Sequence, residues 1–162
     1  MTDPAPVTDA RHPAAVVTGM VTHVLDLASS WPRWDGQPIE VEVEGEPSRI
    51  YTPHKAIRRV ADHLVDHLAE VEARLAGREP EPDGWHASSI TTAADLAPFT
   101  VADLEEARSR LVRLALIWDA RLRSLTDAQL DQAYPDAWTA REVAFHVAGS
   151  DFYADSVGRL PG

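Results

Sequence analysis

Residues 52–77 read TPHKAIRRVADHLVDHLAEVEARLAG, and this stretch predicts a long helix with one apolar face. Thr52 is a typical N-cap, Pro53 suits the first helical position, and Gly77 is a typical stop. Apolar residues recur at helical spacing: Ile57, Val60, Leu64, Leu68, Val71 and Leu75. A helix with one apolar stripe buries that stripe against other elements, so we expect a helical bundle.

Three further helices are expected around this one. Residues 12–29 and 100–125 carry apolar side chains at helical spacing, and a short helical turn is expected after Thr126. The last helix is expected from the Thr139 cap to about residue 157, because Thr139 and Glu142 have the spacing of a capping box.

Two irregular segments interrupt the helices. Residues 39–44 alternate between apolar and acidic side chains, which predicts a strand with one wet face, and residues 48–51 could return as its partner. The segment of residues 78–100 is long and contains prolines, and a short turn is expected near 93–96. Such loops either cover functional sites or merely link elements. We therefore expect a mostly α, four-helix bundle with a small β-hairpin between its first two helices.

The expected domain spans residues 12–162 and follows a disordered leader at residues 1–11. That leader lacks the charged and apolar regions of a signal peptide, and no apolar stretch approaches the ~18 residues of a membrane span, so a cytoplasmic location is expected. The formal net charge of −11 repels phosphate backbones and anionic lipids, so nucleic-acid and membrane partners are not expected.

The composition also limits the chemistry. The chain has no cysteine, which excludes disulfides, thiolate metal ligands and a cysteine nucleophile from within it. It also has no glycine-rich phosphate loop, no Gly-x-Ser-x-Gly elbow and no dinucleotide fingerprint, so nucleotide-dependent chemistry has no support.

Polar side chains interrupt the apolar face of the last predicted helix. At ~100° per residue, Glu142, His146 and Tyr153 point inward together. A buried carboxylate is costly unless it is paired, hydrogen-bonded or bound to a metal, but Glu142 could also act only as a cap. His146 is either functional or a hydrogen-bonded core histidine, and Tyr153 either donates a proton or simply packs.

A second group of histidines lies on the helix of residues 52–77. His63 and His67 are spaced i and i+4, which suits either metal binding or a solvated edge. Segments 57–64 and 140–147 align with Arg, Val, Ala and His in common, so His63 and His146 occupy equivalent points of two helices. Trp85 and His86 could roof a pocket or anchor their loop, and Trp138 is expected to staple the last helix.

These motifs resemble the DinB-like superfamily, which includes bacillithiol transferases and mycothiol-dependent maleylpyruvate isomerase. The resembling stretches are RVADHL at 59–64, RLAG at 74–77, WTAREVAFHVA at 138–148 and DFYAD at 151–155, which together cover less than half of the chain. The resemblance implies a four-helix bundle, often dimeric. It also implies a divalent metal, often zinc or nickel, held by one histidine of the second helix and two residues of the last.

Many members carry His-x3-His on the last helix, whereas the mycothiol-dependent isomerases look to use Glu-x3-His. This chain matches the second pattern and has Ser150 where the first has a histidine. The resemblance thus implies His63, Glu142 and His146 as metal ligands. In a metal-dependent enzyme with these ligands, His67 could be a neighbouring base or alternative ligand and Tyr153 an acid. Such a metal could stabilise a thiolate or generate hydroxide, and the thiol would have to be external, such as mycothiol.

Three functions remain open from the sequence. The first is a metal-dependent transferase or isomerase acting on a small molecule. The second is a metal-free enzyme in which His146 and Glu142 perform acid–base chemistry on an apolar metabolite. The third is a non-catalytic module that binds a ligand or a second copy of itself, with a homodimer as the default.

Overall fold

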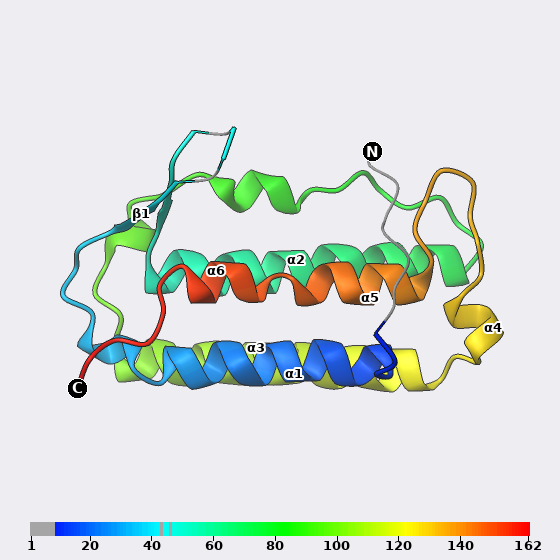
Figure 1. Cartoon of the computed structure of the whole chain (residues 1–162), viewed down its shortest axis with the longest axis horizontal. Coiled ribbons are helices and arrows are strands. Elements are labelled where there is room, and N and C mark those ends of the chain that lie inside the picture. Colours follow the sequence, from blue (N-terminus) through cyan, green and yellow to red (C-terminus); the bar gives the residue numbers. More distant parts are fainter. Residues whose placement is uncertain (1–8, 43, 46) are drawn as a thin grey trace.

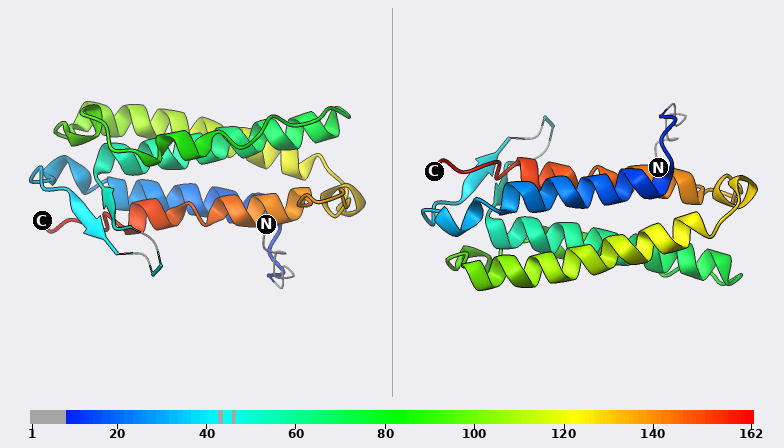
Figure 2. Two further views of the ribbon diagram at one scale, coloured as in Figure 1. Left: turned by 90° about the horizontal axis from the view of Figure 1, so that it is seen from above. Right: turned by 90° about the horizontal axis from the view of Figure 1, so that it is seen from below.

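The computed structural model describes residues 9–42, 44–45 and 47–162, and it arranges them as an elongated, mostly helical bundle (Figure 1). Helix α1 (Pro13–Ala28) lies beside α3 (Val101–Arg123) in one layer. Helix α2 (Pro53–Leu75) lies beside α5 (Ala140–Ala148) and α6 (Asp151–Asp155) in the other, as the two views of Figure 2 show. The expected mostly α architecture is confirmed, whereas its assignment to the DinB-like type stays a prediction.

The ends of α2 follow directly from the local sequence. The Thr52 hydroxyl accepts a hydrogen bond from the Lys55 N–H at 3.2 Å, and Pro53 occupies the first turn. At the other end Gly77 adopts φ +67°, which L side chains rarely tolerate. The N–H of Gly77 then reaches the Arg74 carbonyl, and that of Arg78 reaches the Ala73 carbonyl, as in a Schellman motif. The predicted bounds of this helix are confirmed.

Large side chains fill the space between the two layers. Trp31 and Trp118 are fully buried, together with Leu64 and Leu111. Both indole N–H groups are satisfied, because Trp31 donates to the Gly158 carbonyl at 2.8 Å and Trp118 to the Leu64 carbonyl at 3.1 Å. Buried indoles of this kind fix the distance between layers and hold α2 in place.

The last helix departs from the prediction of one continuous element from Thr139 to about residue 157. It ends at Ala148 and resumes at Asp151 as α6. The N–H groups of Gly149 and Ser150 bond to carbonyls three residues earlier, as do those of Phe152 and Tyr153. Glycine disfavours a helix interior by about 1 kcal/mol relative to alanine, so Gly149 is a suitable place for this tightened junction.

The small hairpin is confirmed but is shorter than predicted. Strand β1 (Ile39–Val41) pairs antiparallel with β2 (Arg49–Tyr51), and Ile39 lies opposite Tyr51. Val43, which was expected to continue the first strand, lies outside the described residues. The expected leader at residues 1–11 does so as well, apart from Asp9, Ala10 and Arg11. No helix in the described part of the chain is both long and apolar enough to cross a bilayer.

The segment from 78 to 100 lies along α2 on the side away from α1 and α3 (Figure 1). It contains the short 3-10 helices η2 (Trp85–Ser89), which was not predicted, and η3 (Ala94–Leu96), which confirms the expected turn. The turn expected after Thr126 is also confirmed, as α4 (Asp127–Leu130).

Asp95 links this segment to the first half of α2 through hydrogen bonds. Its buried carboxylate accepts hydrogen bonds from Arg58 Nη2 at 2.6 Å and from the Thr92 N–H at 2.7 Å. Burial alone would raise the pKa of this carboxyl, but the bonds from Arg58 and Thr92 hold it below its usual value. The Thr52 hydroxyl also donates to the Asp95 carbonyl, so the start of α2 and the loop are fixed together.

We expect Asp95→Asn to lower the free energy of unfolding by about 2 kcal/mol. This is less than the about 3–5 kcal/mol typical of a fully buried pair, because the Arg58 side chain is 30% exposed. Asp119→Asn is the matched control, since its pair with Arg123 is a surface i, i+4 contact worth less than about 0.5 kcal/mol. Equal losses in a urea titration would contradict the role of Asp95.

Candidate metal site

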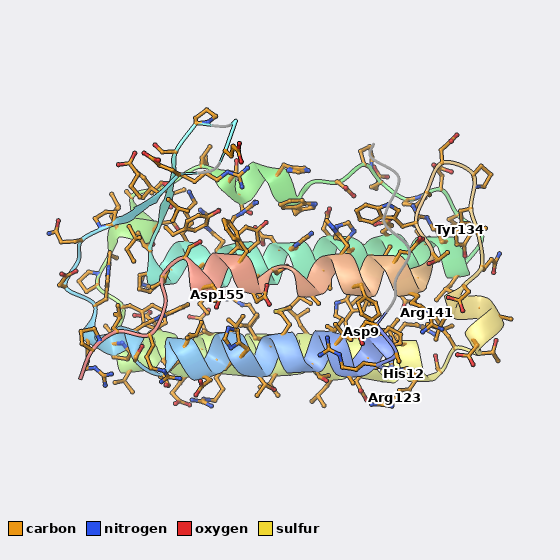
Figure 3. All side chains as sticks on the ribbon, in the orientation of Figure 1. Asp9, His12, Arg123, Tyr134, Arg141 and Asp155 are labelled. Atoms are coloured by element: carbon orange, nitrogen blue, oxygen red, sulfur yellow. The ribbon has the colours of Figure 1, made fainter. Side chains whose placement is uncertain are left out.

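Three imidazoles meet between α2 and α5. His63 and His67 lie one turn apart on α2, both fully buried, and His146 reaches them from α5, half-buried. One ligand nitrogen from each of the three lies within 4.8 Å of the other two, so this group could hold a metal ion. Figure 3 shows two charged side chains of α5 and α6 that turn away from the histidines: Arg141 toward α4, next to which it pairs with Asp131, and Asp155 toward α1.

His67 presents a nitrogen without a partner. Its Nδ1 lies 2.6 Å from a carboxylate oxygen of Glu70, whose other oxygen pairs with Arg74 at 2.6 Å. A carboxylate at Nδ1 fixes the hydrogen there and leaves the lone pair on Nε2, as in many metal-binding histidines. That Nε2 is buried and has no hydrogen-bond partner among the described residues. An unpaired buried acceptor is costly, and a metal ion would relieve that cost.

His63 has a similar arrangement. Its Nδ1 lies 2.6 Å from the Ser150 hydroxyl, and its Nε2 lies 3.0 Å from Nε2 of His146. Two nitrogens bound to one tetrahedral zinc at about 2.0–2.1 Å are about 3.3 Å apart, so the observed spacing is near that of two ligands. It also suits a direct N–H···N hydrogen bond between the two rings.

The surroundings keep His63 and His146 neutral. Burial, together with the neighbouring His67 and His146, lowers the pKa of His63 to about 2. Burial also lowers the pKa of His146 to about 4. Neutral imidazole is the form that ligates metals.

A cavity of about 490 Å³ opens beside the imidazoles, and His67 and His146 form part of its lining. Five acidic side chains and three aromatic residues make up much of the rest: Glu70, Glu79, Glu81, Asp83 and Asp136, with Trp85, His86 and Trp138. The Trp85 ring lies 4.2 Å from the His63 ring, His86 stacks on Trp85 at 3.9 Å, and Trp138 lies 4.4 Å from His146. The segment that carries Trp85 is thus a wall of this cavity as well as an anchored loop. Trp138, expected only as a staple, also packs on a candidate ligand.

Glu142 lies in a different setting from the three histidines. Its carboxylate accepts the Thr139 N–H at 2.7 Å, and its own N–H donates to the Thr139 hydroxyl at 3.2 Å. This completes the predicted capping box, because a side chain at the third helical position bends back toward the cap. Within the described residues, the groups with metal-binding geometry are His63–His67–His146 and His67–Glu70–Asp83, and neither includes Glu142. A ligand role for Glu142 stays a prediction.

Tyr153 is buried, and its hydroxyl accepts a hydrogen bond from Arg59 Nη2 at 3.0 Å. Burial raises the pKa of this phenol. Its ring centre lies 6.4 Å from that of His63, so it borders the histidines, while its hydroxyl is engaged by Arg59. The role of Tyr153 as an acid also stays a prediction.

The sequence reasoning missed the carboxylate behind His67. Glu70 follows His67 by three residues on the same helix, and residues at this spacing are neighbours on a helix surface. That spacing could have identified the pair. The pairing of His63 with Ser150 had no such signal, because the two residues are distant in sequence and meet only through the junction after α5.

Comparison with known proteins gives no match: no protein family, no curated protein and no solved structure is significantly similar to this chain. The resemblance to DinB-like proteins therefore depends on the motifs quoted above.

We expect the metal-free protein to lose stability as the pH falls below about 6.5. The folded-state pKa of His63 is about 2 and its unfolded value is 6.5, so between these values only the unfolded state gains the proton. The contribution of His63 alone lowers the free energy of unfolding by about 1.4 kcal/mol at pH 5.5 and by close to zero at pH 7.5. Urea titrations of the wild type and His63→Asn at both pH values would measure it. An equal pH slope in the two proteins would contradict the buried, neutral state of His63.

Proposed function

We propose that this protein is a metal-dependent enzyme of the DinB-like type, a transferase or isomerase that acts on a small molecule. The observation that carries the proposal is the buried, unpartnered Nε2 of His67 beside the facing Nε2 atoms of His63 and His146. This assigns the metal to His63, His67 and His146. His67 thereby takes the place that the resemblance gives to Glu142.

The chemistry of the donors supports zinc or nickel. Three imidazoles suit either ion, and three protein ligands leave a position for water or substrate. When bound, such an ion supplies Lewis acidity, which stabilises a thiolate or lowers the pKa of water.

The chain's own residues hold the ligands in place and limit access to them. Glu70 and Ser150 hold the His67 and His63 rings through their Nδ1 atoms. Trp85 and Trp138 cover the imidazoles on the side of the cavity.

The cavity favours a small substrate. Its volume of about 490 Å³ falls within the range of about 300–1,000 Å³ typical of small-molecule sites. Because the chain has no cysteine, a thiol-dependent reaction requires a thiol from outside, and the resemblance suggests mycothiol.

A metal-free acid–base enzyme is the second candidate. A continuous chain of contacts favours it, from the Ser150 hydroxyl through both nitrogens of His63 to His146, which lines the cavity. Such a chain could pass a proton between the cavity and the buried hydroxyl without an ion.

Metal content separates the two candidates. We expect the wild type, dialysed against zinc or nickel, to retain close to one equivalent by elemental mass spectrometry, and His67→Ala and His146→Ala to lose it. His86→Ala is the matched control, because His86 lines the same cavity but lies outside the three-histidine group. Glu142→Gln should retain the metal if Glu142 acts only as a cap. A wild type that takes up no metal would contradict the proposal and favour the metal-free enzyme.

Glu70 provides a finer test of the same site. Glu70→Gln should weaken zinc binding by about 10–100-fold, the usual effect of removing a carboxylate behind a histidine ligand. Glu72→Gln is the control, since Glu72 lies on the same helix but pairs with Arg121. Competition with a chromogenic zinc chelator would measure both affinities, and equal affinities would contradict the role of Glu70.

A further inference from the structure

A line of buried polar side chains runs along α2 with a spacing of four residues. Lys55, Arg59 and His63 are each 3% exposed and His67 is 2% exposed. Side chains at i and i+4 are neighbours on a helix surface, so the four groups form one continuous stripe. The histidines at its end belong to the candidate metal site, whereas the two cations at its start have no role there.

Arg59 is a buried cation whose hydrogen-bond partners among the described residues are all neutral. Its Nη1 donates to the Trp85 carbonyl at 2.6 Å and to the Ser88 hydroxyl at 2.9 Å, and its Nη2 donates to the Tyr153 hydroxyl. The guanidinium carbon lies 4.7 Å from the ring centres of both Trp85 and Tyr153. These contacts use three of the five guanidinium donors, so Nε–H and one Nη2 hydrogen remain for another acceptor.

Lys55, the only lysine of the chain, is in a similar position. Its Nζ donates to the Thr91 hydroxyl at 2.9 Å and lies 5.3 Å from the centre of the Tyr51 ring. An ammonium has three donors, and the described residues accept one of them. Asp95 is the carboxylate whose charge acts most on Lys55, but its oxygens are already bonded to Arg58 and Thr92.

Both cations line a second cavity of about 490 Å³ between the hairpin, α2 and the loop after η2. Arg49, which is engaged in interactions of its own, also lines this cavity, and Ser48, Ser89 and Thr91 add hydroxyl groups. No acidic side chain of the described residues lines it. A buried charge without a counter-charge raises the free energy of the folded state. The chain has a net charge of −11, so it has many carboxylates that could have supplied a counter-charge.

We propose that this second cavity binds the carboxylate or phosphate group of a small organic molecule through Lys55 and Arg59. The remaining guanidinium donors suit the two oxygens of such a group, and the ammonium supplies further donors and charge.

The second cavity lies next to the candidate metal site. Trp85 and His86 line both cavities, so the anion site and the imidazoles share a wall. If the proposed function holds, its substrate is a small organic anion whose charged group binds at Lys55 and Arg59. This assignment of substrate class rests on the proposed function, whereas anion binding at Lys55 and Arg59 does not.

Isothermal titration calorimetry of the full chain with inorganic phosphate and with succinate tests the anion site. The buffer contains a chelator and has a fixed ionic strength. We expect Lys55→Met and Arg59→Met each to weaken binding by about 10-fold or more, because a charge-assisted hydrogen bond is lost. Arg113→Met is the matched control: it removes the same charge from the exposed face of α3, where Arg113 bonds to Ser109, and should stay within about 2-fold of the wild type. Thermal denaturation verifies that each variant is folded. If Arg59→Met is not folded, Lys55→Met alone provides the test.

Binding of phosphate alone would assign the site to a phosphorylated ligand, and binding of succinate alone to a carboxylate. Affinity that is unchanged in Lys55→Met, or a wild type that binds neither probe at millimolar concentration, would overturn the proposal. The chelator makes these outcomes independent of the metal. A chain that binds phosphate but no zinc would leave the anion site standing and remove the proposed function alone.

Discussion

The burial of four polar side chains along one face of α2 is the constraint on which the rest of this structure depends. Each of these groups requires partners, and the loop after α2 and the junction after α5 provide several of them. The loop that contains η2 supplies the Trp85 carbonyl and Ser88 hydroxyl to Arg59, and Thr91 to Lys55. This loop is therefore held by the polar stripe of α2 as well as by its aromatic contacts.

The junction between α5 and α6 has the same explanation. It tightens the backbone at Gly149 and Ser150 and leaves the Ser150 side chain buried against His63. Here a serine bonds to the ring of a neighbouring histidine, and His67 supplies a third imidazole from α2. Ser150 and Glu70 thus each bond to Nδ1 of one buried histidine of α2.

Local signals explain why much of the fold could be predicted. The caps at Thr52, Thr100 and Thr139 and the glycine at 77 act within a few residues, so the helix ends they define follow from sequence. The depth of side chains on α2 could not be predicted in this way. A helical wheel places residues by the apolar side chains of their own helix, but the loop from 78 to 100 covers a second flank of α2. His63, assigned to the edge of the helix by the wheel, is buried by Trp85 from that loop.

The proposed binding of an anion by an acidic protein is consistent with the short range of electrostatic forces in salt solution. Exposed charges farther apart than the Debye length, about 8 Å at physiological ionic strength, are largely screened. Opposite charges about 4 Å apart in partly buried surroundings attract by about 4 kcal/mol at an effective dielectric constant of about 20. Lys55 and Arg59 line their cavity directly, whereas Asp95 is neutralised by Arg58 and most other carboxylates lie at the surface. The local pair therefore determines the sign of the potential inside the cavity, and the net charge of −11 acts mainly at long range, where it disfavours large polyanions such as nucleic acids. A site of this kind can discriminate by size, admitting a small anion to a cavity that a charged polymer cannot enter.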